Sequence, residues 1–299
     1  MVIARPVAAA LLATTAAGCG GTSAPAPVTR ARTRPPVTRD IVAALAPLAG
    51  GGLRYGTLRG GEVRDLGSPR VLARVPVRSG GQRGLLGLAV DPRGRTFAAS
   101  VARDGHLVVD QILPEPRRRV WTGPLAADLG NGGHLAVLPE GHLALGVGDL
   151  QRPSRIRDPR ALNGKLLQID TAAPATQPPR ILSGGWNNPF AFATTATGTI
   201  WVADDAPGRR RERLGPGVGP GPRTALRRHL APSGLAILAR DDVAICGVAS
   251  GTLERYRRRS GGRWSHVGTF SARCRYGVAR LAGGDLVVSA DGGLRVVRR

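Results

Sequence analysis

One short element constrains the fold of this chain more than any other feature: a large apolar residue followed by alanine in a short apolar strand. After each copy come a turn rich in Gly, Pro or Asp and a second apolar strand, a pattern that predicts a β-hairpin. Successive copies lie 43 to 57 residues apart. Repeats of this length, built from strands and turns, are typical of β-propeller blades. The copies are Leu88-Ala89, Leu135-Ala136, Phe192-Ala193, Leu235-Ala236 and Val278-Ala279.

The number of blades follows from the length that the repeats must fill. Residues 40–299 divided by six give roughly 43 residues per blade, which suits the repeat. The strand-like segments 53–58 and 63–66, together with 294–297, are expected to complete a sixth blade by joining the two ends of the chain. The sequence therefore predicts an all-β, six-bladed propeller over residues 40–299, with seven blades as the alternative.

Composition agrees with this fold class and argues against others. The chain has 43 Gly and 24 Pro among 299 residues, which disfavours long helical bundles, while its 42% hydrophobic content can supply a core. Beyond the first twenty residues, no apolar run reaches the length that a bilayer span requires.

The net charge of +23 resembles that of a nucleic-acid-binding protein, but its composition points elsewhere. Of the 43 basic residues only Lys165 is lysine, and the arginines are scattered without interleaved aromatic residues. A GC-rich genome raises Arg, Ala, Gly and Pro together, whereas a surface that binds a phosphate backbone has no reason to avoid lysine. We therefore expect no nucleic-acid partner.

The first nineteen residues have the pattern of an export signal. Arg5 precedes an apolar stretch over residues 7–17, and Ala16-Ala17-Gly18-Cys19 resembles a bacterial lipobox in which alanine replaces the usual leading leucine. Lipidation of Cys19 is predicted, with a plain secretory signal as the alternative. Residues 20–39 are expected to form a disordered tether. The sequence thus predicts an exported protein, held at the bacterial membrane by its lipid anchor only.

Two cysteines remain after Cys19, in a compartment where disulfides persist. Cys246 and Cys274 either form a disulfide or are two buried thiols. No CxxC or His cluster of metal-ligand spacing accompanies them.

Several short motifs follow one another between about residues 80 and 291. Together they are far more specific than a single pattern. They are Gln82-Arg83-Gly84-Leu85-Leu86-Gly87-Leu88-Ala89, Asn131-Gly132-Gly133, Gly148-Asp149, Asp158-Pro159, Asn163-Gly164-Lys165-Leu166-Leu167-Gln168-Ile169-Asp170, Asn188-Pro189, the segment 192–201 and the segment 204–212.

This series resembles the glucose/sorbosone dehydrogenases, soluble six-bladed propellers that use pyrroloquinoline quinone (PQQ) and calcium to oxidise aldose sugars to lactones. The resemblance implies a histidine base directly before the Asn-Gly-Gly turn, but this chain has Gly130 there. His134 lies four residues later and is either a displaced base or a histidine packed at the start of an inner strand.

The resemblance also implies cations that bind the PQQ carboxylates. An Arg-Asn pair of the family falls on Asn187 and Asn188, and its lysine falls on Ala249. The late arginine pair falls on Cys274 and Tyr276, although Arg273 and Arg275 flank them and a shift of one residue would restore both.

For calcium and substrate, the resemblance implies a loop and a glutamine. Ala206-Pro207 matches the step whose carbonyl oxygens hold calcium, and Glu212, with Asp204 and Asp205, could add further oxygens. The alternative is a solvated loop whose acids offset the neighbouring arginines. Gln82 matches a residue of the substrate pocket.

Two functions remain open. The first is a PQQ- and calcium-dependent sugar dehydrogenase of the cell envelope with an altered active site, in which His134 or another acid serves as the base. The second is a catalytically inactive envelope propeller that binds a sugar, a wall polymer or a protein. The sequence does not predict the oligomeric state.

Overall fold

The computed structural model describes residues 40–206, 211–226, 229–291 and 293–298. The predicted signal peptide, lipidation site Cys19 and tether, and also Pro207, lie outside these residues. The described chain forms strands and two 3-10 segments, η1 (Pro139–Gly141) and η2 (Pro153–Arg157). Among the described residues, no helix has the length and apolarity needed to cross a membrane.

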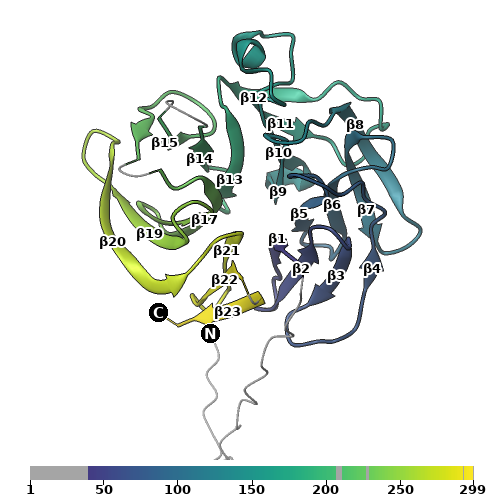
Figure 1. The fold of residues 1–299 in the computed structure, drawn as a ribbon, viewed down its shortest axis with the longest axis horizontal. Helices are drawn as coiled ribbons and strands as arrows, with labels where there is room; N and C mark the ends of the chain where they lie inside the picture. The colour runs from purple at the N-terminus through teal and green to yellow at the C-terminus, as the bar shows by residue number, and fades with distance from the viewer. Residues whose placement is uncertain (1–39, 207–210, 227–228, 292, 299) are drawn as a thin grey trace, which may run out of the picture. The chain divides into compact units, whose positions relative to one another are not determined.

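Six small antiparallel sheets, which we call blades 1 to 6 in chain order, are arranged in a ring (Figure 1). The innermost strands contact one another in succession, and contacts between β1 and β21 close the ring. Blade 1 contains β1 (Val42–Pro47), β2 (Leu53–Thr57), β3 (Glu62–Asp65) and β4 (Ala73–Arg74). Blade 2 contains β5 (Leu85–Val90), β6 (Thr96–Val101), β7 (His106–Leu113) and β8 (Arg118–Leu125). Blade 3 contains β9 (Gly132–Val137), β10 (Leu143–Val147), β11 (Lys165–Ile169) and β12 (Arg180–Gly184).

The remaining blades follow the same up-and-down order. Blade 4 contains β13 (Asn188–Thr194), β14 (Ile200–Asp205), β15 (Arg213–Pro216) and β16 (Thr224–Ala225). Blade 5 contains β17 (Pro232–Ala239), β18 (Asp242–Gly247), β19 (Thr252–Arg258) and β20 (Trp264–Arg273). Blade 6 contains β21 (Gly277–Arg280), β22 (Leu286–Ala290) and β23 (Gly293–Val297), which are its three strands within the described residues.

The predicted six-bladed propeller is confirmed, but the predicted closing blade is wrong. Segments 53–58 and 63–66 form β2 and β3 of blade 1, whereas 294–297 belongs to blade 6. Leu45-Ala46 in β1 is a sixth copy of the large-Ala pair, and it gives blade 1 an inner strand of its own. Hairpins therefore build both terminal blades locally, and the two ends of the described chain do not share a sheet.

The inner strands lie close together around the central channel. A Cβ atom at Gly87 would overlap the carbonyl oxygen of Gly133 in the next blade, and one at Gly146 would overlap that of Pro189. Larger residues then fill the space between neighbouring sheets, as Leu88 does against Ala44 of blade 1. Alternation of glycine or alanine with large residues thus sets the spacing of the ring.

Register shifts recur near the first residues of the inner strands. In the described chain they occur in the inner-strand pairings of blades 1 to 5, for example between Asn188 and Ala191 of β13. Bulges bend a strand and re-aim its side chains. The affected end of each inner strand lies at one mouth of the channel, where the candidate site is found.

Candidate functional site at the mouth of the channel

The channel contains two hollows at different depths. The mouth pocket, a cavity of about 210 Å³, is lined by the first residues of the inner strands and by their preceding connections. The lower pocket, about 290 Å³, is lined by the later residues of the same strands, including all six large-Ala pairs. The polar residues of the mouth pocket are Gln82, Asn188, Asp205, Ser233 and Tyr276.

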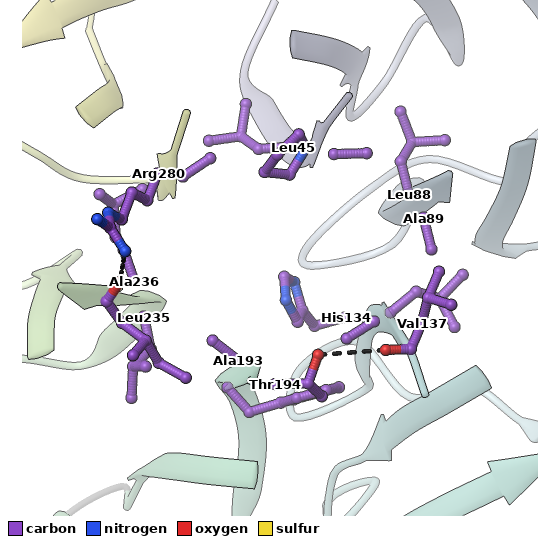
Figure 2. A pocket seen from close by; sticks show the side chains of 18 of the residues that line it. Leu45, Leu88, Ala89, His134, Val137, Ala193, Thr194, Leu235, Ala236 and Arg280 are labelled. Atoms are coloured by element: carbon purple, nitrogen blue, oxygen red, sulfur yellow. Dashed lines mark hydrogen bonds between the residues drawn. The ribbon is translucent and has the colours of Figure 1, made fainter. Parts of the chain in front are cut away.

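His134 lines the lower pocket and not the mouth pocket (Figure 2). Its ring meets the ring of Phe192 edge-on, with centroids 4.7 Å apart, and that of Phe190 at 5.9 Å. Burial lowers the pKa of His134 to about 4, so the imidazole is neutral near pH 7. The structure therefore places this candidate base among aromatic side chains, away from Gln82 and Asn188.

Gly130, at the position of the expected base, has a backbone conformation that disfavours a side chain. Its φ of 69° lies in the left-handed region, and a Cβ atom there would lie 2.7 Å from Oδ1 of Asp149. The backbone N–H of Gly130 donates to Oε1 of Gln82 at 2.8 Å. Gln82 therefore lines the mouth pocket as predicted for a substrate residue, while its oxygen fixes the adjacent loop.

Asn187 and Asn188 are held by one buried carboxylate. Oδ1 of Asp204 accepts the backbone N–H groups of both asparagines at 2.8 and 2.9 Å, and Oδ2 accepts Nδ2 of Asn187 at 2.9 Å. Arg213 neutralises Asp204 across 2.6 Å. Of the two asparagines only Asn188 lines the mouth pocket, where its Oδ1 accepts the N–H of Gly132.

Asp205 is the acidic group of the mouth pocket. Its Oδ2 lies 3.5 Å from Nδ2 of Asn188. Burial, reinforced by the nearby Glu212 and Asp204, raises the pKa of Asp205 to about 6. This carboxyl group can therefore donate or accept a proton close to neutral pH.

Arg273 and Arg275, the predicted cofactor cations, are not among the lining residues of the mouth pocket, although Nε of Arg275 donates to the carbonyl oxygen of the lining residue Val248 at 3.4 Å. Both line a separate hollow at the rim together with Ala249. Nη1 of Arg275 pairs with Oδ2 of Asp291 at 2.7 Å. Tyr276, the alternative match, lines the mouth pocket and its hydroxyl donates to Oδ1 of Asp291 at 2.5 Å. Among the described lining residues of the mouth pocket there is no arginine or lysine.

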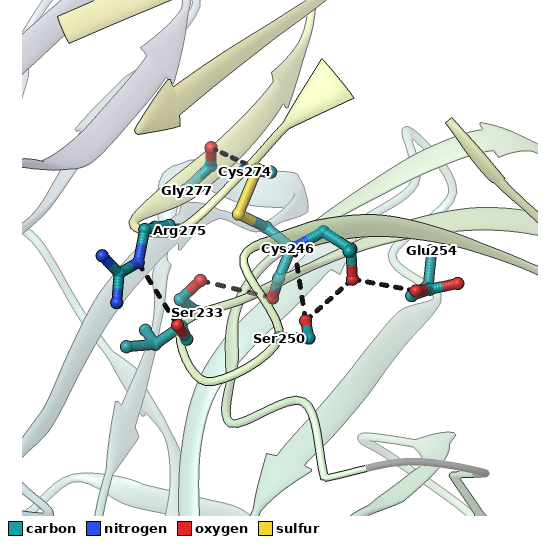
Figure 3. Close-up of a disulfide and its surroundings, with 9 residues drawn as sticks. Ser233, Cys246, Ser250, Glu254, Cys274, Arg275 and Gly277 are labelled. Carbon is teal, nitrogen blue, oxygen red and sulfur yellow. Dashed lines mark hydrogen bonds between the residues drawn. A yellow bond between two sulfur atoms is a disulfide. The ribbon is translucent and has the colours of Figure 1, made fainter. Parts of the chain in front are cut away.

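Cys246 and Cys274 form a disulfide that joins β18 to the connection between β20 and β21 (Figure 3). Both cysteines are fully buried and neither lines the mouth pocket. The neighbouring Ser233 donates its hydroxyl to the carbonyl of Cys246 at 3.2 Å. The disulfide thus fixes the wall behind Ser233 and leaves the channel open.

The predicted calcium loop is only partly described. Ala206 is buried directly after β14, and Pro207 lies outside the described residues. Both oxygens of Glu212 accept backbone N–H groups, from Leu230 and Ala231 at 2.6 and 2.7 Å, and Oε1 also lies 2.9 Å from Nδ1 of His229. Within the described part of the chain, no cluster of three His, Cys, Asp or Glu side chains is arranged to hold a metal ion.

The motifs that carry the resemblance stabilise the loops around the mouth. The side chain of Asn131 bonds both backbone groups of Ala127. Nδ2 of Asn163 donates to the carbonyl of Asp149 at 2.8 Å, and the buried Nζ of Lys165 donates to the carbonyl oxygens of Ile156 and Asn163. These residues hold the loops by hydrogen bonds within the chain, which need no bound cofactor.

Comparison with known proteins agrees with this architecture. No protein-family profile and no curated protein matches the sequence. Solved structures match over most of the chain, and all three described in the next paragraph are sugar dehydrogenases. The chain has the fold of the sugar dehydrogenases. The resemblance predicted from the motifs is thereby confirmed at the level of the fold.

The first of these structures is a glucose dehydrogenase from Thermus thermophilus, with 24% identity and a TM-score of 0.70 over 88% of this chain and 98% of that chain. The second is the PQQ-bound aldose sugar dehydrogenase of Streptomyces coelicolor, with 20% identity and a TM-score of 0.69 over 88% and 96%. The third is the apo form of the soluble aldose sugar dehydrogenase of Escherichia coli, with 20% identity and a TM-score of 0.68 over 89% and 99%.

The described lining residues of the mouth pocket do not fit PQQ. The cofactor carries several carboxylates, and burying them without cations costs several kcal/mol each. The described lining offers no cation and instead contains Asp205, whose ionised form would repel the carboxylates of PQQ.

The sequence pattern does not identify Ser233 as a lining residue, although its place at the start of an inner strand is the signal that could have found it.

Proposed function

We propose that this protein is a carbohydrate-binding propeller that holds an uncharged sugar ring in the mouth pocket and performs no PQQ-dependent oxidation. The observation that carries the proposal is the lining of this pocket. Amide, carboxyl and hydroxyl groups surround an apolar floor that includes Phe190 and Leu86, with no cation among the described residues. A few placed polar groups over an apolar surface suit a ligand that is both hydroxylated and partly apolar.

Each polar group has a defined capacity toward such a ligand. The carboxyl group of Asp205, with a pKa of about 6, can accept a hydrogen bond from a sugar hydroxyl when ionised and donate one when protonated. Gln82 uses its oxygen on Gly130, so its Nε2 is the atom that can donate to a ligand. Tyr276 contributes an aromatic side chain to the lining.

We also infer that residues 1–39 deliver this domain to the cell envelope, as an export signal followed by a lipid-anchored tether. This part of the proposal rests on the sequence pattern around Cys19. An envelope location would bring the mouth pocket to saccharides of the cell surface. Radiolabelled palmitate should label the full-length chain in a bacterial host, and a Cys19→Ser variant should remain unlabelled.

Titration calorimetry of the full-length chain with neutral trisaccharides tests the binding function. We expect saturable binding of at least one of maltotriose, cellotriose, chitotriose or methyl-esterified trigalacturonate. An Asp205→Asn/Gln82→Ala variant should weaken it roughly tenfold, because hydrogen bonds to a buried site are lost. Arg280→Gln in the lower pocket is the matched control and should bind like the wild type.

Absence of binding to all four trisaccharides would contradict the proposal. Binding that the Arg280→Gln control weakens as much as the mouth variant does would also contradict it, because the ligand would then not be in the mouth pocket.

A further inference from the structure

A second hollow lies beside the mouth pocket, on the other side of the Asn187-Asn188 pair. We call it the basic hollow. It has a volume of about 520 Å³ and lies between η2 and the start of β15. Asn188 lines the mouth pocket, whereas Asn187 lines the basic hollow. The polar and charged residues that line the basic hollow are Ser154, Arg157, Asn187, Arg211 and Arg213.

One of the three arginines that line the basic hollow, Arg213, is held in place, and Arg223 lies behind it. Nη2 of Arg213 lies 2.6 Å from Oδ2 of Asp204 and 2.9 Å from the carbonyl oxygen of Gly185. Behind it, the guanidinium of Arg223 stacks on the ring of Trp186 at 3.6 Å and donates to the carbonyl of Gly184 at 3.0 Å. These contacts hold both guanidinium groups in place before any ligand arrives.

The other two arginines of the basic hollow are available to a ligand. Arg157 and Arg211 are exposed, and neither has an ion-pair partner among the described residues. Among the described residues, Asp204 is a carboxylate that bonds this lining, and its oxygens are already bonded by Arg213, Asn187 and Asn188. The hollow therefore has uncompensated positive charge in a concave site, which suits an oxyanion.

The basic hollow and the mouth pocket share a wall. Asp204 contacts Arg213 on one side and the backbone of Asn188 on the other. We propose that the basic hollow binds the carboxylate or phosphate group of an acidic saccharide whose neighbouring, uncharged ring occupies the mouth pocket. The saccharide part of this inference rests on the proposed function, whereas the anion part rests on the arginines.

The test compares a trisaccharide that has one acidic ring and two uncharged rings, glucuronosyl-xylobiose, with its methyl ester, using the full-length chain at 150 mM salt. We expect the acid to bind roughly tenfold more tightly than the ester, because arginine and carboxylate form charge-assisted hydrogen bonds. An Arg157→Gln/Arg211→Gln variant should lose most of this preference and keep its affinity for the ester. Inorganic pyrophosphate and a glycerol phosphate trimer serve as phosphate probes.

A matched variant separates the site from the bulk charge of the chain. Arg103→Gln/Arg263→Gln removes two other exposed arginines that have no ion-pair partner among the described residues, and it should keep the preference for the acid. An equal loss of preference in both double variants would overturn the inference, because the effect would then be non-specific. Equal binding of acid and ester by the wild type, with no effect of phosphate probes, would overturn it and leave the proposed function intact.

Failure of the proposed function has a different signature. Binding of neither trisaccharide, together with pyrophosphate binding that requires Arg157 and Arg211, would overturn the saccharide part and leave a phosphate site. Tighter binding of the glycerol phosphate trimer than of glucuronosyl-xylobiose, lost in the Arg157→Gln/Arg211→Gln variant, would support the same site and identify phosphate as the preferred anion.

Discussion

At Gly130 the backbone conformation disfavours a side chain at the position of the expected base. A side chain there would adopt a φ of 69° and meet Asp149. We expect Gly130→Ala to lower the free energy of unfolding by ~2 kcal/mol or more, from left-handed strain together with the steric overlap. Gly94→Ala is the matched control, because Gly94 has a φ of 80° with open space around its Cβ position, so it should cost ~1 kcal/mol.

Urea unfolding of the two variants measures this difference. An equal loss of stability in both would contradict the steric part of the argument. Gly130→His should likewise be destabilised, and it should gain no dehydrogenase activity with PQQ, calcium and glucose. Recovered activity would show that the site tolerates the base that we consider blocked.

Asp205 predicts a pH dependence of stability with a defined sign. Its pKa is raised from 3.8 to about 6 in the folded chain, so the unfolded chain loses this proton at lower pH. The stabilisation of the fold that comes from this bound proton is fully present below pH 4 and is lost as the pH rises through 6. We expect Asp205→Asn to be more stable than the wild type by ~1 to 3 kcal/mol at pH 7.5, and nearly equal to it at pH 4.

Thermal unfolding at both pH values tests this prediction. Glu115→Gln, a substitution at an exposed acid, is the control and should show no such difference. An Asp205→Asn variant that is less stable than the wild type at pH 7.5 would contradict a burial-raised pKa, since it would mean that the ionised carboxylate stabilises the fold.

At the scale of elements, the disulfide ties blade 5 to the entry of blade 6. It closes a segment with a sequence separation of 28 residues. Cross-links over loops of this length stabilise by ~3 to 4 kcal/mol, chiefly by restricting the unfolded chain. We expect a Cys246→Ser/Cys274→Ser variant to lose about this much, and dithiothreitol to lower the melting temperature of the wild type but not that of the variant. Equal sensitivity of both proteins to dithiothreitol would contradict a stabilising role of the disulfide.

The segment that begins β17 depends on Glu212 in a comparable way. Its carboxylate accepts two backbone N–H groups, from Leu230 and Ala231. Glu212→Gln replaces one acceptor by a donor, and we expect a loss of ~1 to 3 kcal/mol. Since the carboxylate is occupied, millimolar calcium should change the melting temperatures of wild type and variant equally. A calcium-dependent stabilisation present only in the wild type would identify Glu212 as a ligand.

Elements of the repeat were predictable from sequence because each hairpin is local. The large-Ala pairs at Leu135 and Leu235 indicate apolar strands, and the Gly, Pro and Asp residues that follow each pair indicate the turn of its hairpin. Leu45-Ala46 was missed, and with it the composition of the closing blade, because a single pair near the end of the recognisable repeat carries little signal.

The site was less predictable than the fold, because the motifs that carry the resemblance reflect the backbone geometry of the loops and not the chemistry of a ligand. Asn131 and Lys165 fix loops around the mouth, so they resemble the dehydrogenases whether or not a cofactor binds. Bulges decide which side chains face the channel, and the two-residue period of a strand does not reveal them. His134 was therefore a reasonable candidate base in sequence, although its ring packs against Phe192 in the lower pocket.

At the scale of the whole molecule, a propeller combines a rigid ring with a variable mouth. The inner strands and their close contacts keep the dehydrogenase fold, while Gly130, Asp205 and Tyr276 alter what the mouth can hold. The net charge of +23 acts over the entire surface, so it favours anionic neighbours without specifying one. Specificity must come from placed groups in the mouth pocket and the basic hollow.

A calorimetric titration of the full-length chain with PQQ, with and without calcium, tests the central claim most directly. A ligand that binds the folded state stabilises it in proportion to the logarithm of its concentration over the dissociation constant, so thermal unfolding gives a second readout. We predict no saturable heat and no calcium-dependent rise in melting temperature, while the trisaccharide that binds best produces both a saturable heat and a rise. Saturable, calcium-dependent binding of PQQ would contradict the account and restore the dehydrogenase function.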